Sequence, residues 1–311
     1  MVTIILSQKL NTKSGFVNIL GVPNSGKSTL INTLVGSKIS IVSHKVQTTR
    51  FCVRGICNFT LSDKSQSQVI LIDTPGVFSA KRRLDKAMVS AAWSELGHSD
   101  KVIFIHDVTK SLDDNTIDIL KKIEKVKVNI ILVLNKIDLL KKEKLLSKIS
   151  EFKSFYNFEK TFLISAKNGN GCKELVEYLA FSMPSHPLMY DDQTVSDLPQ
   201  SILASEITRE KLFQSLNKEL PYNLMVQTEK WDVNKDKSIN IQQTIYINKN
   251  SHKPIILGKS GQNIKRIGIL SRKDLEKLFK TKIHLFLFVK FKKNWMEDPS
   301  NYKNIGLDYN A

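Results

Sequence analysis

The sequence predicts an α/β domain, with a mostly parallel sheet and helices on both faces, followed by a smaller α+β domain. Between residues 16 and 180, short apolar runs alternate with helically spaced segments, and the pattern changes after residue 198. Strands that alternate with helices indicate a parallel sheet, because each crossover helix returns the chain to the same edge. The apolar runs are Phe16–Leu20, Val69–Ile72, Val102–Ile105, Val128–Leu134 and Thr161–Ile164.

Helical spacing separates these strands. Apolar residues recur every three or four positions over residues 28–35, 84–96, 112–123 and 140–152, as in helices that bury one face. The alternating run Phe51–Leu61 predicts one more strand. The near-continuous apolar character of residues 129–134 predicts a strand that is buried on both sides.

The second domain has a different order of elements. Residues 183–198 contain two prolines and no regular period, which is typical of a linker. We expect a first domain at 15–182, this linker at 183–198, a second domain at 199–293 and a tail at 294–311. The expected order in the second domain is α-β-β-α-α-β, with a helix over 200–216, strands over 222–233 and 239–248, helical segments up to 280 and a strand over 283–291.

Composition limits the classes of function. The 311 residues carry 47 Lys and Arg against 30 Asp and Glu, a net charge of +17, which indicates an anionic partner such as nucleic acid or acidic lipid. No run approaches 18 apolar residues, and the run Val2–Leu6 is too short for a signal peptide. Three cysteines do not make a disulfide framework, so Cys52 and Cys57 are expected to be reduced structural thiols rather than zinc ligands.

A phosphate-binding loop follows the first predicted strand. Residues 21–28, GVPNSGKS, match G-x-x-x-x-G-K-[ST] and open a predicted helix, which is the context that the motif requires. Backbone N–H groups of such a loop hold phosphates at the helix N-terminus. We expect Lys27 to reach the β- and γ-phosphates and the Ser28 hydroxyl to bind Mg²⁺.

Three further motifs end predicted strands in order. Asp73-Thr74-Pro75-Gly76 can hold Mg²⁺ through Asp73 and approach the γ-phosphate through the Gly76 N–H. Asp138, in NKID, can accept hydrogen bonds from guanine N1–H and its amino group, which adenine lacks, so we expect GTP rather than ATP. Asn135 can brace the loop, the Lys136 stem can cover the base, and the Ala166 N–H can reach guanine O6. The residues assigned to the nucleotide are Gly21, Asn24, Ser25, Gly26, Lys27, Ser28, Thr29, Asp73, Gly76, Asn135, Lys136, Asp138, Ser165, Ala166 and Lys167.

Two features concern the rate of hydrolysis. The polar segment Ser37–Arg50 contains QTTR and can order around the γ-phosphate and Mg²⁺. Thr49 is the expected Mg²⁺ ligand, beside Ser28 and Asp73, with Thr48 as the alternative. Val77 follows DTPG where Ras-like enzymes place a water-orienting Gln, so we expect slow turnover that a partner, a monovalent cation or a backbone group accelerates. Asn24 is the candidate ligand for such a cation, K⁺; the residues assigned to catalysis are Lys27, Thr49, Gly76 and Asn24.

A second glycine loop lies in the basic part of the chain. Residues 249–293 carry 13 Lys and Arg against two acidic residues, and this charge surrounds Gly258-Lys259-Ser260-Gly261. The GxxG loop, the flanking isoleucines and the order of elements resemble a KH domain, whose loop clamps single-stranded nucleotides. The residues assigned to RNA are Ile256, Gly258, Lys259, Ser260, Gly261, Ile264, Lys265 and Arg266.

Together these motifs resemble the Era family of bacterial GTPases over roughly residues 15 to 310. The resemblance rests on GVPNSGKSTLIN, ISIVSHKVQTTR, DTPGVF, NKID, SAKNGNG, the KH-like domain and the closing WMEDPSNYKNIGLDY. It implies GTP or GDP with Mg²⁺, binding of the 3′ end of small-subunit (16S) ribosomal RNA, and a GTP-switched role in maturation of the 30S subunit. It also implies a cytoplasmic protein with a peripheral fraction at the inner membrane, and we expect a monomer. Ser25, Ser260 and the polar stretch 62–67 depart from the family pattern.

Two other interpretations stay open at this point. The basic second domain would also suit a membrane-surface regulatory GTPase that binds anionic lipid, and a signalling switch with a protein partner has less support. Lys81-Arg82-Arg83 would contact RNA or an activator, although a solvated loop is the simpler interpretation. The six histidines are scattered, and none is assigned to catalysis.

Overall fold

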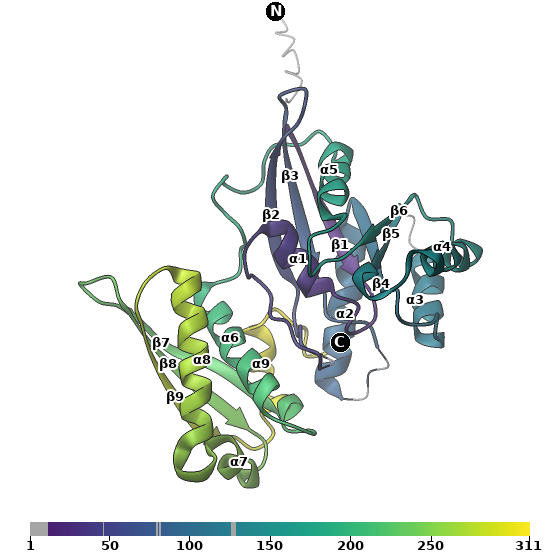
Figure 1. Cartoon of the computed structure of the whole chain (residues 1–311). Helices are drawn as coiled ribbons and strands as arrows, with labels where there is room; N and C mark the ends of the chain where they lie inside the picture. The colour runs from purple at the N-terminus through teal and green to yellow at the C-terminus, as the bar shows by residue number, and fades with distance from the viewer. Residues whose placement is uncertain (1–11, 46, 79, 81, 126–128) are drawn as a thin grey trace, which may run out of the picture. The chain divides into compact units, whose positions relative to one another are not determined.

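The computed structural model describes residues 12–45, 47–78, 80, 82–125 and 129–311, and the chain forms two units (Figure 1). The apolar run at residues 2–6, Lys81 and Val128 lie outside the described residues. The first unit contains residues up to Ser37, then 54–73 and 93–197. The second contains 38–53, 74–92 and 198–311.

A six-stranded sheet forms the first unit within the described part of the chain. Its order is β2 (Val53–Thr60), β3 (Gln66–Asp73), β1 (Thr12–Leu20), β4 (Lys101–Asp107), β5 (Ile130–Asn135) and β6 (Lys160–Ile164). The pairs β1–β3, β1–β4, β4–β5 and β5–β6 are parallel, which confirms the predicted mostly parallel sheet. Strands β4 and β5 are buried along their whole length, which confirms the prediction made for β5.

Helices connect these strands. They are α1 (Lys27–Val35), α2 (Arg83–Ser94), α3 (Asp114–Glu124), α4 (Lys142–Phe155) and α5 (Cys172–Ser182). Helix α3 begins after Asp113, whose carboxylate accepts a hydrogen bond from the Thr116 N–H at 2.8 Å and so satisfies a free donor of the first turn. Helix α5 has no counterpart in the sequence analysis, because its apolar residues follow the SAK motif and a short glycine-containing turn.

The second unit contains a three-stranded sheet within the described residues, with β8 (Ile239–Ile247) between β7 (Leu224–Val233) and β9 (Ile283–Phe291). Strand β8 pairs antiparallel with β7 and parallel with β9. Figure 1 shows α6 (Gln200–Ser215) and α8 (Gln262–Phe279) along one face of this sheet. With α7 (Lys253–Leu257), the order α-β-β-α-α-β is confirmed; α9 (Pro299–Lys303) lies in the tail.

The core of the second unit lies between the sheet and its helices. Alternate residues of β8 are buried, since Ile241, Ile245 and Ile247 have no exposed surface. The other face of the sheet carries exposed side chains, including Phe286 and Phe288 of β9. This burial follows the two-residue period of a strand except at Thr244, which is also buried.

Residues 38–53 and 74–92 belong to the second unit by their contacts, although the sequence boundaries include them in 15–182. Both segments bury apolar side chains, such as Ile41 and Met88, and the first also makes polar contacts to α6. Lys38 pairs with Glu210 of α6 at 2.6 Å, and the Val42 N–H donates to the other carboxylate oxygen at 2.8 Å. Glu210 of α6 thus contacts this segment through both of its carboxylate oxygens.

The three cysteines are free thiols. Cys57 and Cys172 are buried, and burial raises their pKa values to about 12 and about 11, whereas Cys52 is half-buried. Across the ranges that the structure covers, no group of side chains could hold a metal through His, Cys, Asp and Glu. A search of the same ranges finds no helix that is long and apolar enough to cross a membrane.

Phe152 is expected to be a main support of the first unit. It has no exposed surface, and its ring lies 4.8 Å from the His106 ring and 6.3 Å from that of Phe104. Phe152→Ala should lower the free energy of unfolding of this unit by about 3–5 kcal/mol. Phe155, on the same helix, is 50% exposed, so Phe155→Ala should cost less than about 1 kcal/mol. Urea unfolding of both variants checks this, and equal losses would contradict it.

Candidate functional site

The phosphate-binding loop joins β1 to α1 and leaves no room for side chains at two glycines. Gly26 has a φ of +104°, and a Cβ there would lie 2.1 Å from Asn135 Nδ2. A Cβ on Gly21 would lie 2.4 Å from the Ile105 carbonyl oxygen. The loop can therefore wrap closely around a phosphate only with glycine at both positions.

Lys27, the first residue of α1, is buried inside this loop. Its ammonium donates to the carbonyl oxygens of Gly21 at 3.0 Å and Val22 at 3.1 Å. Burial lowers its pKa from 10.5 to about 8, and the nearby Asp73 carboxylate opposes that shift. An amine held in this way gains a strong anionic partner when phosphate oxygens arrive.

Asn135 ties three of the predicted motifs together. Its side chain is buried at the end of β5, where Nδ2 donates to the Ser25 carbonyl oxygen at 2.8 Å. Its Oδ1 accepts from the Ala166 N–H at 2.9 Å. The predicted bracing role is thus visible. The Ala166 N–H, which the sequence analysis assigns to guanine O6, is occupied by Asn135 in this structure.

Lys136 makes a second link between motifs. Its ammonium donates to the Asn24 carbonyl oxygen at 2.9 Å and pairs with Asp107 at 2.6 Å. Asn24 and Lys136 both have positive φ values, 66° and 68°, which non-glycine residues adopt at a cost of about 1 kcal/mol or more.

Asp107 was missed in the sequence analysis. It ends β4, and the only signal for it is its place after the apolar run at 102–105. Partial burial raises its pKa, but hydrogen bonds from Lys136 and Thr109 outweigh that effect and lower the pKa below the usual range. Asp107 therefore stays ionised and holds the Lys136 ammonium against the loop.

The proposed guanine-recognition residues follow β5 and β6. Asp138 is exposed in a short turn after β5, which leaves its carboxylate accessible to a base. Ser165 and Ala166 are buried after β6, and Lys167 is exposed. The Gly169 N–H donates to the Ser165 carbonyl oxygen at 2.8 Å and closes this turn.

The candidate Mg²⁺ ligands fall in both units. Ser28 of α1 and the buried Asp73 at the end of β3 belong to the first unit, as does Thr29. Thr49 and Gly76, both buried, belong to the second unit. Thr48, the alternative ligand, donates its hydroxyl hydrogen to the Lys45 carbonyl oxygen at 2.6 Å.

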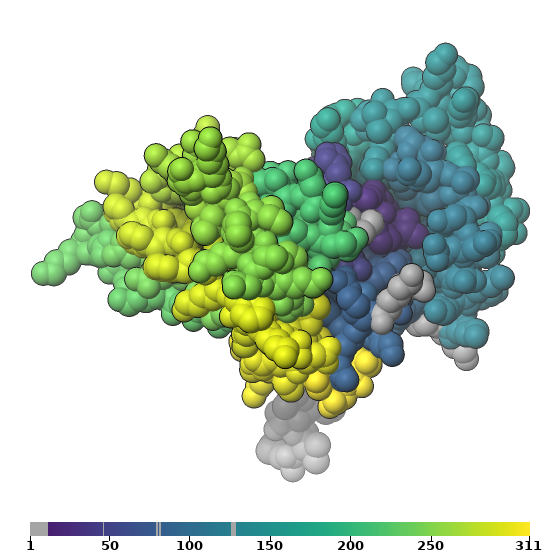
Figure 2. Space-filling view, turned by 90° about the horizontal axis from the view of Figure 1, so that it is seen from below, coloured from purple at the N-terminus to yellow at the C-terminus, as the bar shows by residue number. Residues whose placement is uncertain are grey.

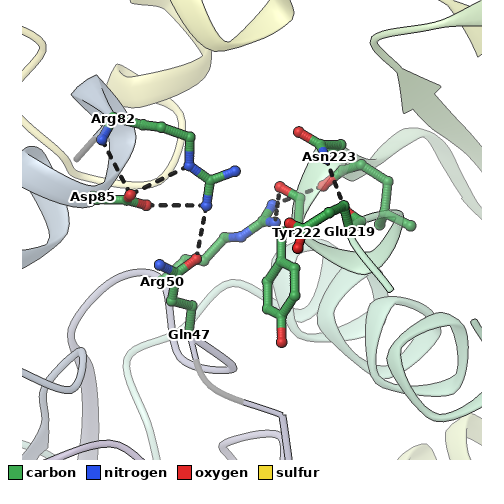
Figure 3. Close-up of polar contacts among 8 residues, drawn as sticks. Gln47, Arg50, Arg82, Asp85, Glu219, Tyr222 and Asn223 are labelled. Carbon is green, nitrogen blue, oxygen red and sulfur yellow. Dashed lines mark hydrogen bonds and ion pairs between the residues drawn. The ribbon is translucent and has the colours of Figure 1, made fainter. Parts of the chain in front are cut away.

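The QTTR segment is anchored within the second unit. Figure 3 shows the Arg82 guanidinium between Asp85 and the Gln47 side-chain oxygen, which it reaches at 3.0 Å. The buried Arg50 guanidinium donates to the carbonyl oxygens of Leu224 at 2.8 Å and Tyr222 at 3.3 Å. Arg50 was not assigned a role from sequence, although it is part of the motif.

The closing tail contacts the same segments. Arg50 lies 5.8 Å from the centre of the Trp295 ring, and burial together with the Arg209 charge lowers its pKa to about 9. Arg83 pairs with Glu297 at 3.1 Å and lies 4.4 Å from the centre of the Tyr309 ring. Figure 2 shows the yellow tail on the surface next to the blue of α2. Arg82 and Arg83 therefore have ion-pair partners in the second unit, although both side chains keep substantial exposed surface.

The GxxG loop joins α7 to α8 in an unusual backbone conformation. Gly258, Ser260 and Gly261 have φ values of 72°, 49° and 75°. A Cβ on Gly258 would lie 2.7 Å from that of Asn263, whose side-chain amide donates to the Ile256 carbonyl oxygen at 3.1 Å. A Cβ on Gly261 would meet nothing within 4 Å, so its surroundings are open to a ligand.

The other residues assigned to RNA differ in exposure. Lys259, Ser260, Lys265 and Arg266 are all exposed around the loop. Ile264 is half-buried against the core. Ile256 has no exposed surface, so it supports the loop from the core and has no surface to offer RNA in this structure. Ile255, which is 57% exposed, is the isoleucine of α7 that faces solvent.

Comparisons with known proteins match both units. Residues 16–136 match the family model described as 50S ribosome-binding GTPase, and residues 219–296 match that of the KH domain. The chain is 45% identical to GTPase Era of Brucella suis over 303 residues, 97% of this chain and 96% of the relative. It is 46% identical to GTPase Era of Agrobacterium fabrum over 96% of this chain and 93% of the relative.

Two solved structures resemble the whole chain. One is a point variant of Aquifex aeolicus Era bound to GDP.AlF4−, with a TM-score of 0.89 and 32% identity over 94% of this chain and 99% of the other. The second is Era in complex with MgGDPNP and nucleotides 1506–1542 of 16S ribosomal RNA. It has a TM-score of 0.88 and 32% identity over 95% of this chain and 99% of the other.

Removing the Asn135 bridge should weaken nucleotide binding. Asn135→Asp keeps the shape of the side chain but replaces the donor to the Ser25 carbonyl oxygen with an acceptor. The buried oxygen then loses its partner, at a cost of about 1–3 kcal/mol. We expect GTP and GDP affinities to fall by about 10- to 100-fold in titrations with a fluorescent nucleotide. Asn168→Asp, in the turn after Ser165, is the control, and unchanged affinity in Asn135→Asp would contradict the bridge.

Nucleotide binding should take up a proton near pH 9. Below about pH 8, Lys27 is protonated in both the folded and the unfolded chain; between about 8 and 10.5 the unfolded chain binds this proton more tightly. The stability of the empty protein therefore rises with pH across that window. Bound phosphates restore the proton, so nucleotide affinity should fall as pH rises above about 8. Calorimetry in two buffers of different ionisation enthalpy measures the uptake, and its absence would refute the assignment.

Proposed function

Because this chain belongs to the Era family of GTPases, we propose that it is a GTP-switched factor that binds the 3′ end of 16S ribosomal RNA. The GxxG loop of the second unit would hold the single-stranded RNA, and the loop at residues 21–28 would hold GTP. The Era relative solved with MgGDPNP and 16S nucleotides supports this assignment. We further propose that the chain acts in maturation of the 30S subunit and leaves it after hydrolysis.

One observation carries the link between GTP and RNA. The QTTR segment and the start of α2 pack in the same unit as the GxxG loop, through Gln47, Arg50, Arg82 and Arg83. Segments of this kind order around the γ-phosphate and relax after hydrolysis. We propose that the ordering of these segments by GTP is passed on to the RNA-binding domain within the second unit. By reciprocity, RNA should strengthen GTP binding by the factor by which GTP strengthens RNA binding.

The donor set suits Mg²⁺, which prefers oxygen ligands. The Ser28 hydroxyl and the buried Asp73 carboxylate lie at the start of α1 and the end of β3, and Thr49 would add a further oxygen. When bound, Mg²⁺ would offset the charge of the phosphates. Lys27 would stabilise the charge that develops on the γ-phosphate, and the Gly76 N–H would donate to it.

Hydrolysis without a partner should be slow. Val77 is only 6% exposed and has no polar group with which to orient water. We propose that K⁺ beside the phosphates, held by Asn24, accelerates the reaction together with RNA or another partner. A monovalent cation adds positive charge where negative charge builds up in the transition state.

We also propose a monomer in the cytoplasm, with a peripheral fraction at the inner face of the membrane. The net charge of +17 supports attraction to anionic lipid as a secondary property. The 16S RNA complex of the Era relative favours RNA over lipid as the main ligand of the second unit. Lipid attraction follows net charge, whereas RNA binding at the GxxG loop depends on the glycines. A glycine variant of unchanged net charge therefore separates the two kinds of binding.

Gly261→Ala should weaken RNA binding without changing net charge. The residue has a φ of 75°, which strains an alanine by about 1–2 kcal/mol and moves the loop. We expect about a tenfold loss of affinity of the GTP-loaded protein for the 3′-terminal 16S sequence, measured by fluorescence anisotropy. Gly306→Ala is the matched control, because Gly306 also has a positive φ of 69° and open surroundings. Equal effects of the two variants, or equal loss of binding to anionic vesicles, would contradict a glycine-dependent RNA site.

Exchange of K⁺ for Na⁺ should slow GTP hydrolysis at constant ionic strength. We expect a decrease of about tenfold or more if the smaller Na⁺ does not occupy the site, because the charge that is then lost contributes at least about 1.4 kcal/mol to the transition state. Asn24→Ala should remove the difference between the two ions. Steady-state phosphate release measures both effects, and a rate that is indifferent to the ion would refute the role of K⁺.

A further inference from the structure

Two buried arginines, Arg50 and Arg209, lie close together in the second unit. Of the two, Arg209 is the one that pairs directly with a carboxylate among the described residues. Arg209 of α6 is 2% exposed and Arg50 is 6% exposed. Glu206 pairs with Arg209 through both of its oxygens, with the Nε–Oε1 distance at 2.7 Å. The hydrogen-bond partners of Arg50 are the carbonyl oxygens of Tyr222 and Leu224, which are dipoles and carry no full negative charge.

The charges around these arginines do not cancel. Two more charges affect Arg50 electrostatically: Arg82, in the turn before α2, and Asp85, in α2. They form an ion pair with each other at 3.2 Å. Among the described residues these are three guanidinium groups and two carboxylates, and 3 − 2 leaves one positive charge in excess. A buried charge without a counter-ion costs several kcal/mol, so proteins rarely retain one.

A cavity of about 40 Å³ lies at this cluster. Arg50, Arg209 and Glu206 line it, together with Asn301, Tyr302 and apolar side chains that include Phe51, which follows the QTTR segment, and Trp295 of the tail. The Nη1 atom of Arg209 is buried and has no hydrogen-bond partner in the described part of the chain. The amide of Asn301 and the hydroxyl of Tyr302 already donate to the carbonyl oxygens of Trp295 and Met296.

We propose that this cavity binds a small monovalent anion, such as chloride, between Arg50 and Arg209. The anion accepts a hydrogen bond from Arg209 Nη1 and supplies the missing negative charge. A water molecule would satisfy the donor but would leave the charge uncompensated. Glu206 also lines the cavity, so the anion lies on the side of the two guanidinium groups. The volume suits one halide ion and is too small for a nucleotide or a metabolite.

The bound anion would stabilise one arrangement of the QTTR segment. Residues of that segment, of α6 and of the tail all line the cavity, and Arg209 also donates to the Thr48 carbonyl oxygen. Anything that binds the folded form alone stabilises it by mass action. The anion thus holds residues 48–50 against α6. This inference does not depend on RNA binding.

The test combines crystallography with unfolding. The native chain is crystallised without halide and then soaked in sodium bromide, and an anomalous peak is expected in the cavity beside Arg50 and Arg209. In solution, the unfolding temperature of the native chain should be about 4 °C or more higher in sodium chloride than in sodium gluconate at equal ionic strength. Water alone in the cavity, or bromide confined to the surface, would overturn the proposal. A cavity peak without halide-dependent stabilisation, an adventitious ion only, would overturn it as well.

A paired variant isolates the site. Arg209→Met with Glu206→Gln removes the donor and its carboxylate together, so net charge is conserved and no buried carboxylate is left alone. It should abolish the difference between chloride and gluconate. Lys230→Met with Asp232→Asn removes an exposed pair on β7 as the matched control and should retain the difference. If the cavity variant does not fold, the bromide peak and the halide effect on the native chain decide the question.

Discussion

The nucleotide site depends on one buried amide. Asn135 donates to the Ser25 carbonyl oxygen of the loop and accepts from the Ala166 N–H. One side chain therefore connects the end of β5, the residues after β6 and the phosphate-binding loop. Gly26 has no side chain because Asn135 occupies that space. Lys136, the next residue, adds hydrogen bonds from its ammonium to the Asn24 carbonyl oxygen and the Asp107 carboxylate. A loop that must hold several phosphate charges is thereby positioned before any ligand arrives, which reduces the entropy cost of binding.

In the second unit, charged side chains add directional contacts to the apolar core and help to hold two chain segments in place. Lys38, Arg50 and Arg83 fasten two polar segments to α6, β7 and the tail. Ion pairs and hydrogen bonds to backbone carbonyls are directional and can be exchanged one for another. Such fastenings suit segments that must also respond to a nucleotide, because changing partners costs less than opening a packed core.

Much of the fold and of the nucleotide site could be predicted because each motif ends an apolar strand. The parallel sheet and the α-β-β-α-α-β order follow from periodicity, and the bracing role of Asn135 follows from its place after β5. Asp107 and Asn263 could not be found in this way, since a lone Asp or Asn in sequence gives no sign of the backbone it will support. The packing of residues 38–53 and 74–92 in the second unit could not be predicted from the sequence either. It involves contacts between residues more than 160 positions apart, such as those of Lys38 and Val42 with Glu210.

The three thiols are buried to different extents, so a native cysteine can serve as a chemical probe of the QTTR segment. Deep burial protects Cys57 and Cys172 by keeping them protonated, whereas Cys52 is half-buried and lies two residues after Arg50, beside the Ala91 carbonyl oxygen. A thiol reagent will therefore modify Cys52 first. Its rate of alkylation reports directly how loosely the QTTR segment is held, and no cysteine has to be introduced or removed.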